Sequence, residues 1–318
     1  MKLSGLSNVA LTLILPGLIL IQFGCSKKNP QQDTLKEYRK MIEKQKAASV
    51  KDEDEALKKI PEMTAEGYEK LGDSYVRQGN LDMAFIQYDR ALKLNSKGMN
   101  VRYKIGRLFL EKGLTEEAKK EFQEILKTEP SHALSHEGMG RAYIKLGEWG
   151  EAEKSFQKAI RLNSHLWQAH NFLGIIYDRQ KQFDAAIDQY KKAISINPND
   201  AALFNNLGMA FFFKGDYEKA IKAYSEGIKI DVSNGKIHNN LALVLYKLGK
   251  YEDTFEAFKR GGDEPTAYYN MGCLYMMEGK YIEAVQVFEK AIELKPGFYI
   301  KAHESLKKAK AAANAKAQ

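Results

Sequence analysis

A pattern of small and aromatic residues recurs every 34 residues along most of the chain after residue 64. The first small residue forms a column made of Gly72, Gly106, Gly140, Gly174, Gly208, Ala242 and Gly272. A second small residue follows twelve positions later, at Ala84, Ala118, Ala152, Ala186, Ala220, Thr254 and Ala284. An aromatic residue comes four positions after that, at Tyr88, Phe122, Phe156, Tyr190, Tyr224, Phe258 and Phe288. A fixed period of this length predicts a stack of similar supersecondary units.

Each repeat is predicted to be a pair of amphipathic helices, because its apolar residues recur at spacings of three and four. A glycine-containing turn such as RQGNLD or KLGEWG separates the two helices, and Pro130, Pro198 and Pro296 close three of the repeats. Glycine inside a helix costs about 1 kcal/mol relative to alanine. Its recurrence therefore indicates that a neighbouring helix presses against the backbone there, and we expect the aromatic column to fill the space between repeats.

This pattern resembles the tetratricopeptide repeat family, whose signature is a 34-residue period with these small and aromatic positions. The family's tryptophan near the start of each repeat is absent, and its place is taken by Tyr68, His136, His170, Phe204, His238 and Tyr268. The resemblance implies an all-α fold, a right-handed α-solenoid of about seven helix-turn-helix units with a C-terminal capping helix. The predicted repeats are residues 65–98, 99–132, 133–166, 167–200, 201–234, 235–264 and 265–298, followed by a capping helix and tail at 299–318.

One repeat is shorter than the others. Ala242 and Gly272 are 30 residues apart, four fewer than the period. We predict that the second helix of the sixth repeat ends early at Gly261–Gly262 and that Pro265 lies in the first turn of the next helix. A local bend is expected at this junction.

The N-terminus has the pattern of an export signal. An apolar run of thirteen residues from Val9 to Ile21 follows Lys2, whereas a membrane-spanning helix needs roughly twenty residues. The segment ending in Gly24–Cys25 resembles the lipobox of bacterial lipoproteins, although Gln22 and Phe23 depart from the usual residues. The resemblance implies cleavage after Gly24 and lipidation of Cys25.

These features predict a signal peptide at residues 1–24 and a lipidated cysteine with a polar, partly helical tether at 25–64. The protein would then be held in the bacterial cell envelope by its N-terminal lipid, at the inner or the outer membrane. A plain secreted protein with an incidental cysteine and an uncleaved anchor are the alternatives.

Composition gives no indication of catalysis or of nucleic-acid binding. The net charge of +8 arises from 49 basic and 41 acidic residues, with lysine and glutamate alternating as on solvated helix faces. Two cysteines exclude a disulfide framework. His132 and His136 are four residues apart but have no third ligand nearby, and the histidines of the repeats are interpreted as packing residues. We therefore predict that the chain is not an enzyme and needs no cofactor or metal.

The resemblance implies that the first helices of the repeats line a concave groove. The predicted groove positions are mainly charged in the first three repeats. In the last four they are amides and large apolar residues, and we predict that these bind partners: Asn171, Asn205, Asn206, Asn239, Asn240, Asn270, Met209, Phe212, Phe213, Leu243, Tyr246 and Met276. An asparagine amide carries a donor and an acceptor, as does the peptide unit of an extended chain.

We interpret the protein as a membrane-tethered scaffold that captures extended segments of other proteins in this groove, in the assembly of an envelope complex. The alternative is a structural organiser that docks folded partners, or associates with itself, through its convex face. The sequence does not determine the oligomeric state.

The lipoprotein interpretation predicts that Met1 to Gly24 is absent from the mature protein and that Cys25 carries acyl chains. Two or three chains would hold the protein stably, since each buried methylene contributes about 0.8 kcal/mol. The intact mass of the protein extracted from membranes should show the lipid increment. A mature chain that begins elsewhere, or an unmodified Cys25, would contradict this interpretation.

Overall fold

The computed structural model describes residues 63–296 and 300–317 of the chain. The described residues are helical and contain no strand. The predicted signal peptide, Cys25 and most of the predicted tether lie outside them. None of the helices in the described ranges has both the length and the apolar character needed to cross a membrane.

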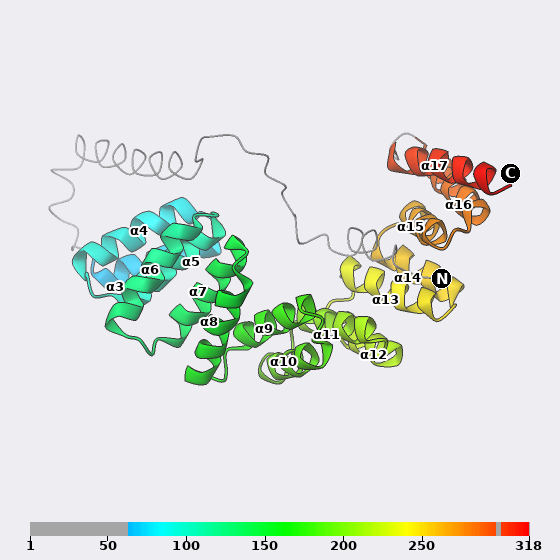
Figure 1. Ribbon diagram of the computed structural model, residues 1–318. Helices are drawn as coiled ribbons and strands as arrows, with labels where there is room; N and C mark the ends of the chain where they lie inside the picture. Colours follow the sequence, from blue (N-terminus) through cyan, green and yellow to red (C-terminus); the bar gives the residue numbers. More distant parts are fainter. Residues whose placement is uncertain (1–62, 297–299, 318) are drawn as a thin grey trace, which may run out of the picture. The chain divides into compact units, whose positions relative to one another are not determined.

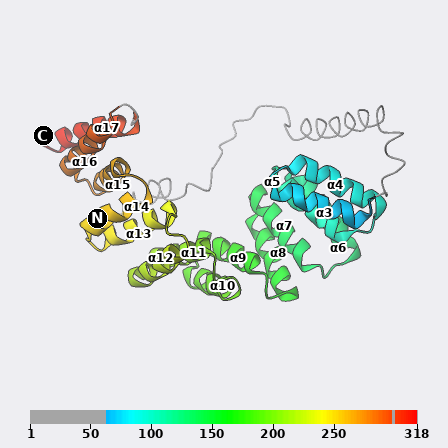
Figure 2. The same ribbon diagram turned by 180° about the vertical axis from the view of Figure 1, so that it is seen from behind.

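The described residues form seven successive helix pairs and one final helix (Figures 1 and 2). The helices are α3 (Ala65–Arg77), α4 (Leu81–Leu94), α5 (Met99–Glu111), α6 (Thr115–Thr128), α7 (Ala133–Leu146), α8 (Trp149–Leu162), α9 (Trp167–Arg179), α10 (Phe183–Ile196), α11 (Ala201–Lys214), α12 (Tyr217–Ile230), α13 (Gly235–Lys247), α14 (Tyr251–Gly261), α15 (Glu264–Met277), α16 (Tyr281–Leu294) and α17 (Ile300–Ala317). The pairs lie within the predicted repeat ranges, except that α15 begins one residue before the predicted boundary at 265. The fold is thus an α-solenoid.

The chain divides into two compact units at Ser164 and His165. The first contains α3 to α8, and its core packs Tyr88, Leu108 and Phe122 together. The second contains α9 to α17, and its cores follow the chain in three successive clusters around Tyr190 and Tyr224, Phe258, and Phe288. The predicted binding residues all belong to the second unit.

The glycine column is explained by the aromatic column. A Cβ atom added at Gly174 would lie 2.4 Å from Cε1 of Tyr190, and one added at Gly208 would lie 2.5 Å from Cε1 of Tyr224. The neighbouring helix that presses on each glycine is therefore the second helix of the same repeat. The rings fill space chiefly within a repeat, which corrects the expectation that they lie between repeats, although Phe122 also reaches Gly138 of the next repeat.

The shortened repeat has the predicted structure. Helix α14 has 11 residues and ends at Gly261, whereas the other second helices have 14. Asp263 caps α15 by accepting a hydrogen bond from the backbone N–H of Thr266 at 2.9 Å, and Pro265 lies in the first turn. The early end of α14 is confirmed, and the bend stays a prediction.

The C-terminal helix covers the last repeat. Ala309 of α17 is fully buried in one cluster with Ala284 and Phe288 of α16, and Leu306 packs against this cluster. Without α17 the apolar side of α16 would face solvent, since a stacked repeat array leaves its last repeat uncovered. The predicted capping helix is therefore present.

The contact between the ring and the glycine predicts opposite effects for two Gly-to-Ala changes. Gly174→Ala should lower the free energy of unfolding by about 1–3 kcal/mol, because its Cβ overlaps the buried ring of Tyr190. Gly150→Ala, where a Cβ meets nothing within 4 Å, should be neutral or stabilise by up to about 1 kcal/mol. Urea unfolding of both variants measures this, and equal stabilities would show that the contact does not fix the helix pair.

Candidate functional site

Two pairs of asparagines connect the first helices of consecutive repeats in the second unit. The Nδ2 group of Asn206 in α11 donates to Oδ1 of Asn171 in α9 at 2.9 Å. The Nδ2 group of Asn240 in α13 donates to Oδ1 of Asn205 in α11 at 2.8 Å. The structure therefore brings four of the predicted asparagines together as two equivalent pairs. We call these four residues the asparagine face.

Each pair leaves hydrogen-bonding capacity unused. An asparagine amide has two N–H donors and an oxygen with two lone pairs, and the bond within a pair uses one donor and one lone pair. The four side chains are partly exposed. The bond also fixes the orientation of both amides, so that the remaining donors and acceptors are held before any ligand arrives. Such preorganisation lowers the entropic cost of binding.

A third pair of this kind is not formed. The equivalent partner of Asn270 would be Asn239, but Oδ1 of Asn239 is buried and has no hydrogen-bond partner among the described residues. A Cβ atom added at Gly261 would lie 2.5 Å from this oxygen, so the amide faces the end of α14. The shortened α14 thus turns the amide oxygen of Asn239 toward the end of that helix and away from a pair with Asn270, and its role in binding stays a prediction. Asn270 is partly exposed, outside the two pairs.

The predicted apolar residues divide into exposed and buried members. Phe213 is 43% exposed, stacks on Phe183 with ring centroids 6.0 Å apart, and meets Phe212 edge-on at 5.5 Å. Met209, Phe212, Leu243 and Met276 are partly exposed.

Tyr246 is a correction to the predicted binding set. It is only 4% exposed and packs against Tyr251 and Tyr275, with centroid distances of 5.3 and 6.2 Å. Its ring belongs to the core of the sixth and seventh repeats. It is therefore not the wall of an open pocket.

A carboxylate that the sequence prediction missed lies on the same helix as Asn171. Asp178 of α9 accepts a hydrogen bond from the Tyr190 hydroxyl at 2.8 Å, while its Oδ1 atom is buried without a partner. Burial raises the pKa of Asp178 to about 6. The buried Tyr224 hydroxyl also has no partner in the described structure, and burial, followed by the charge of Asp178, raises its pKa. The sequence does contain a feature that distinguishes Asp178. It lies four residues after Gly174, at a position where the other repeats have large apolar residues.

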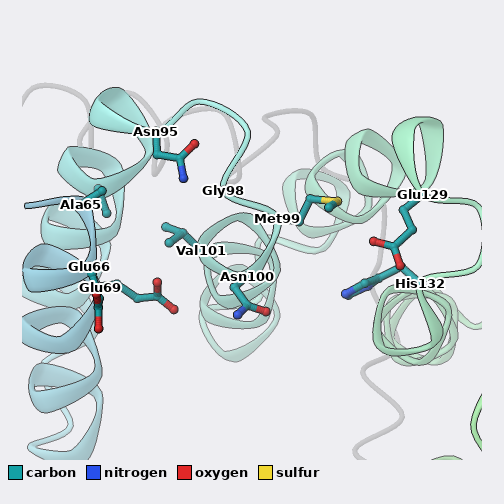
Figure 3. Close-up of a pocket in the computed structure, with 11 residues that line it drawn as sticks. Ala65, Glu66, Glu69, Asn95, Gly98, Met99, Asn100, Val101, Glu129 and His132 are labelled. Atoms are coloured by element: carbon teal, nitrogen blue, oxygen red, sulfur yellow. The ribbon is translucent and has the colours of Figure 1, made fainter.

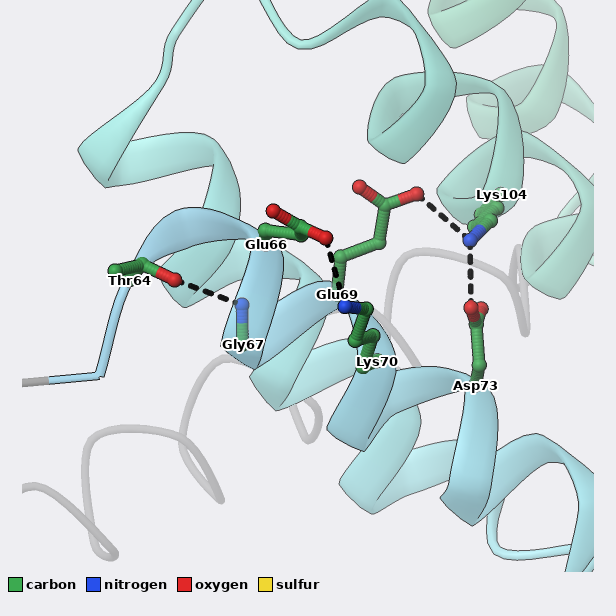
Figure 4. A network of polar contacts seen from close by, with 7 residues as sticks. All are labelled: Thr64, Glu66, Gly67, Glu69, Lys70, Asp73 and Lys104. Atoms are coloured by element: carbon green, nitrogen blue, oxygen red, sulfur yellow. Dashed lines mark hydrogen bonds and ion pairs between the residues drawn. The ribbon is translucent and has the colours of Figure 1, made fainter.

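In the first two repeats, several charged side chains of the first helices α3 and α5 pair with one another (Figure 4). The Lys104 ammonium lies 2.7 Å from Glu69 and 2.8 Å from Asp73, and the Tyr88 hydroxyl donates to Asp73 at 2.7 Å. Burial works to raise the pKa of Asp73, but the hydrogen bonds from Lys104 and Tyr88 outweigh it and hold this pKa below its ordinary value. These charges therefore stabilise the stacking of α3, α4 and α5.

A cavity of about 440 Å³ opens beside this network (Figure 3). Its polar lining includes Glu66, Glu69, Glu129 and His132, and Glu66 and Glu69 already pair with Lys70 and Lys104. None of the predicted binding residues lines it. Across the described ranges, no group of three or more His, Cys, Asp or Glu side chains is placed to hold a metal ion.

Comparison with known families agrees with the repeat pattern. A family model described as the cilia and flagella-associated protein 70 C-terminal domain matches residues 32–263, and the tetratricopeptide repeat model matches residues 265–298. The first of these models covers more than half of the chain, and the chain therefore belongs to that family of tetratricopeptide-repeat domains. The two matches meet at the shortened junction between the sixth and seventh repeats.

Solved tetratricopeptide-repeat structures have the same fold. A tetratricopeptide repeat protein from Parabacteroides merdae is 16% identical over 77% of this chain and 98% of that chain, with a TM-score of 0.53. PilF from Pseudomonas aeruginosa is 19% identical over 68% of this chain and 98% of that chain, also with a TM-score of 0.53. No curated protein matches the sequence.

The histidines at the family's tryptophan position make local structural contacts. The Nε2 atoms of His136 and His238 each lie 2.9 Å from a carbonyl oxygen of the preceding loop, those of Pro130 and Val232. His170 lies 2.8 Å from Gln189 through its Nδ1 atom, and both His170 and His238 are buried. These contacts agree with the prediction of packing histidines.

Asp178 should make stability depend on pH. Its folded pKa of about 6 lies above the ordinary 3.8, so the folded state binds the proton more tightly and this group adds stability as the pH falls through 6. Asp178→Asn removes that gain while it keeps an acceptor for Tyr190. Between pH 7.5 and pH 5 the wild type should gain roughly 1 kcal/mol of stability that the variant does not gain. Urea unfolding of both proteins at both pH values tests this. The same change in stability with pH in both proteins would contradict it.

Proposed function

We propose that the protein is a binding scaffold that captures an extended segment of a partner protein along the asparagine face. The observation that carries this proposal is the pair of equivalent asparagine bonds, Asn206 to Asn171 and Asn240 to Asn205. Each bond presents further amide donors and acceptors at the spacing of the repeats. An extended backbone offers donors and acceptors that can satisfy them.

The exposed apolar residues beside this face would supply selectivity. Phe213, Phe212 and Met209 follow the asparagines along α11 within two helical turns. Aromatic and methionine side chains form adaptable apolar contacts with a ligand. The amides would hold the backbone of the segment, and these residues would select its side chains.

Anchoring to a membrane is a separate part of the proposal, supported by the sequence of residues 1–25. In this proposal the lipid on Cys25 holds the chain in the bacterial envelope and residues 25–64 form the tether. The repeats would then capture partners near the membrane surface, in the assembly of an envelope complex. No catalytic step is part of this function.

The proposal predicts that removal of two amides weakens binding. A library of random peptides displayed on phage is selected on the full-length chain, and the affinity of a recovered peptide is measured by calorimetry. Asn206→Ala with Asn240→Ala should cost two neutral hydrogen bonds to the ligand, about 1–3 kcal/mol or roughly 5- to 150-fold in affinity. The control pair, Asn100→Ala with Asn199→Ala, changes two exposed asparagines that are not members of the asparagine face.

A melting curve of each variant controls for folding. The asparagine bonds also join repeats, so a small loss of stability is expected, partly offset because alanine is the better helix former. Recovery of no peptide, or wild-type affinity in the folded double variant, would favour docking of folded partners on another surface.

A further inference from the structure

We propose that Asp178 makes the asparagine face selective for segments that carry a lysine or arginine, whose cationic group pairs with this carboxylate. This inference rests on the proposed capture of an extended segment and names the chemistry of that segment. It assigns Asp178 a role in recognition in addition to its hydrogen bond with Tyr190.

The position of Asp178 places it beside the bound segment. Asp178 follows Asn171 by seven residues on α9, which is two helical turns, or about 10.5 Å along the axis. Residues at this spacing lie on one face of a helix. A segment held by Asn171 and Asn206 and extended along α9 therefore reaches the carboxylate within about three to four residues.

Asp178 is the one acidic residue at the corresponding positions of the second unit. The positions compared are those three and two residues before the small column, and one, four and five residues after it, on α9, α11, α13 and α15. Apart from Asp178, they hold amides, apolar residues and two cations, Arg179 and Lys247. A ligand segment would therefore meet a single negative charge in surroundings that are mainly apolar and amide. An apolar side chain placed there would leave that charge without a partner.

The carboxylate lacks a counter-ion in the described structure. The carboxylate accepts a hydrogen bond from the neutral Tyr190 hydroxyl, and within the part of the chain that the structure describes it forms no ion pair with a lysine or arginine. In the first repeat, Asp73 likewise accepts a hydrogen bond from a core tyrosine, Tyr88, but there Lys104 supplies a cation to the carboxylate. Oδ1 of Asp178 is buried and keeps unused accepting capacity, and the residue as a whole is partly exposed. A cation from a ligand would supply the missing charge partner.

The selection of displayed random peptides tests the inference on the full-length chain. Peptides recovered by the wild type should share a lysine or arginine flanked by apolar residues. Replacement of that basic residue by methionine should weaken binding to the wild type roughly tenfold. The same peptide change should have less than a twofold effect on the Asp178→Asn variant. Asp188→Asn, which removes an exposed carboxylate paired with Lys192, is the matched control and should keep the tenfold effect.

The outcomes separate this inference from the proposed function. Recovered peptides without a basic preference, or a preference that Asp178→Asn leaves intact, would overturn the role of Asp178 while peptide capture stands. Recovery of no peptide would overturn both. The peptide change is made against the wild-type protein, so the inference stays testable even if Asp178→Asn unfolds.

Discussion

The contact between an aromatic ring and a glycine backbone organises every helix pair that carries the full pattern. The ring of Tyr190 or Tyr224 can approach the first helix only because no Cβ lies beneath it. At 100° per residue, a position four residues after the glycine is only about 40° from this contact. Asp178, four residues after Gly174, accordingly reaches the hydroxyl of Tyr190. The positions three and two residues before the glycine lie farther from the ring, at about 60° and 160° around the helix axis.

The asparagine pairs depend on the regular period that this packing maintains. Asn171 and Asn206 are 35 residues apart, as are Asn205 and Asn240, so each bond joins equivalent places on adjacent first helices. Across the shortened α14 the same bond would need Asn239 and Asn270. There the amide of Asn239 instead faces Gly261 and stays unpaired. A deletion of about one helical turn thus ends a row of amides that the sequence alone shows as continuous.

Much of the fold was predictable because it follows from local periodicity. The repeat column, the early end of α14 and the capping helix each leave a pattern within a few dozen residues. The candidate site was predictable only in part, since it depends on which side chains meet across repeats. Four asparagines of the predicted column do meet as two hydrogen-bonded pairs, and their role in binding stays a prediction. Burial of Tyr246 and the orientation of Asn239 depend on neighbours from another helix, which no single-repeat pattern records.

Asp178 shows why the exceptions to a repeat pattern are informative. Its position is apolar in the neighbouring repeats, where Phe212 and Tyr246 pack without a buried charge. A carboxylate there is desolvated, which disfavours its ionised form and raises its pKa. One tyrosine hydroxyl offsets only part of this penalty, because the second oxygen finds no donor. The carboxylate also serves folding, because it accepts the hydrogen bond of the buried Tyr190 hydroxyl, which an apolar residue could not do, while its second oxygen is left for the basic side chain proposed above.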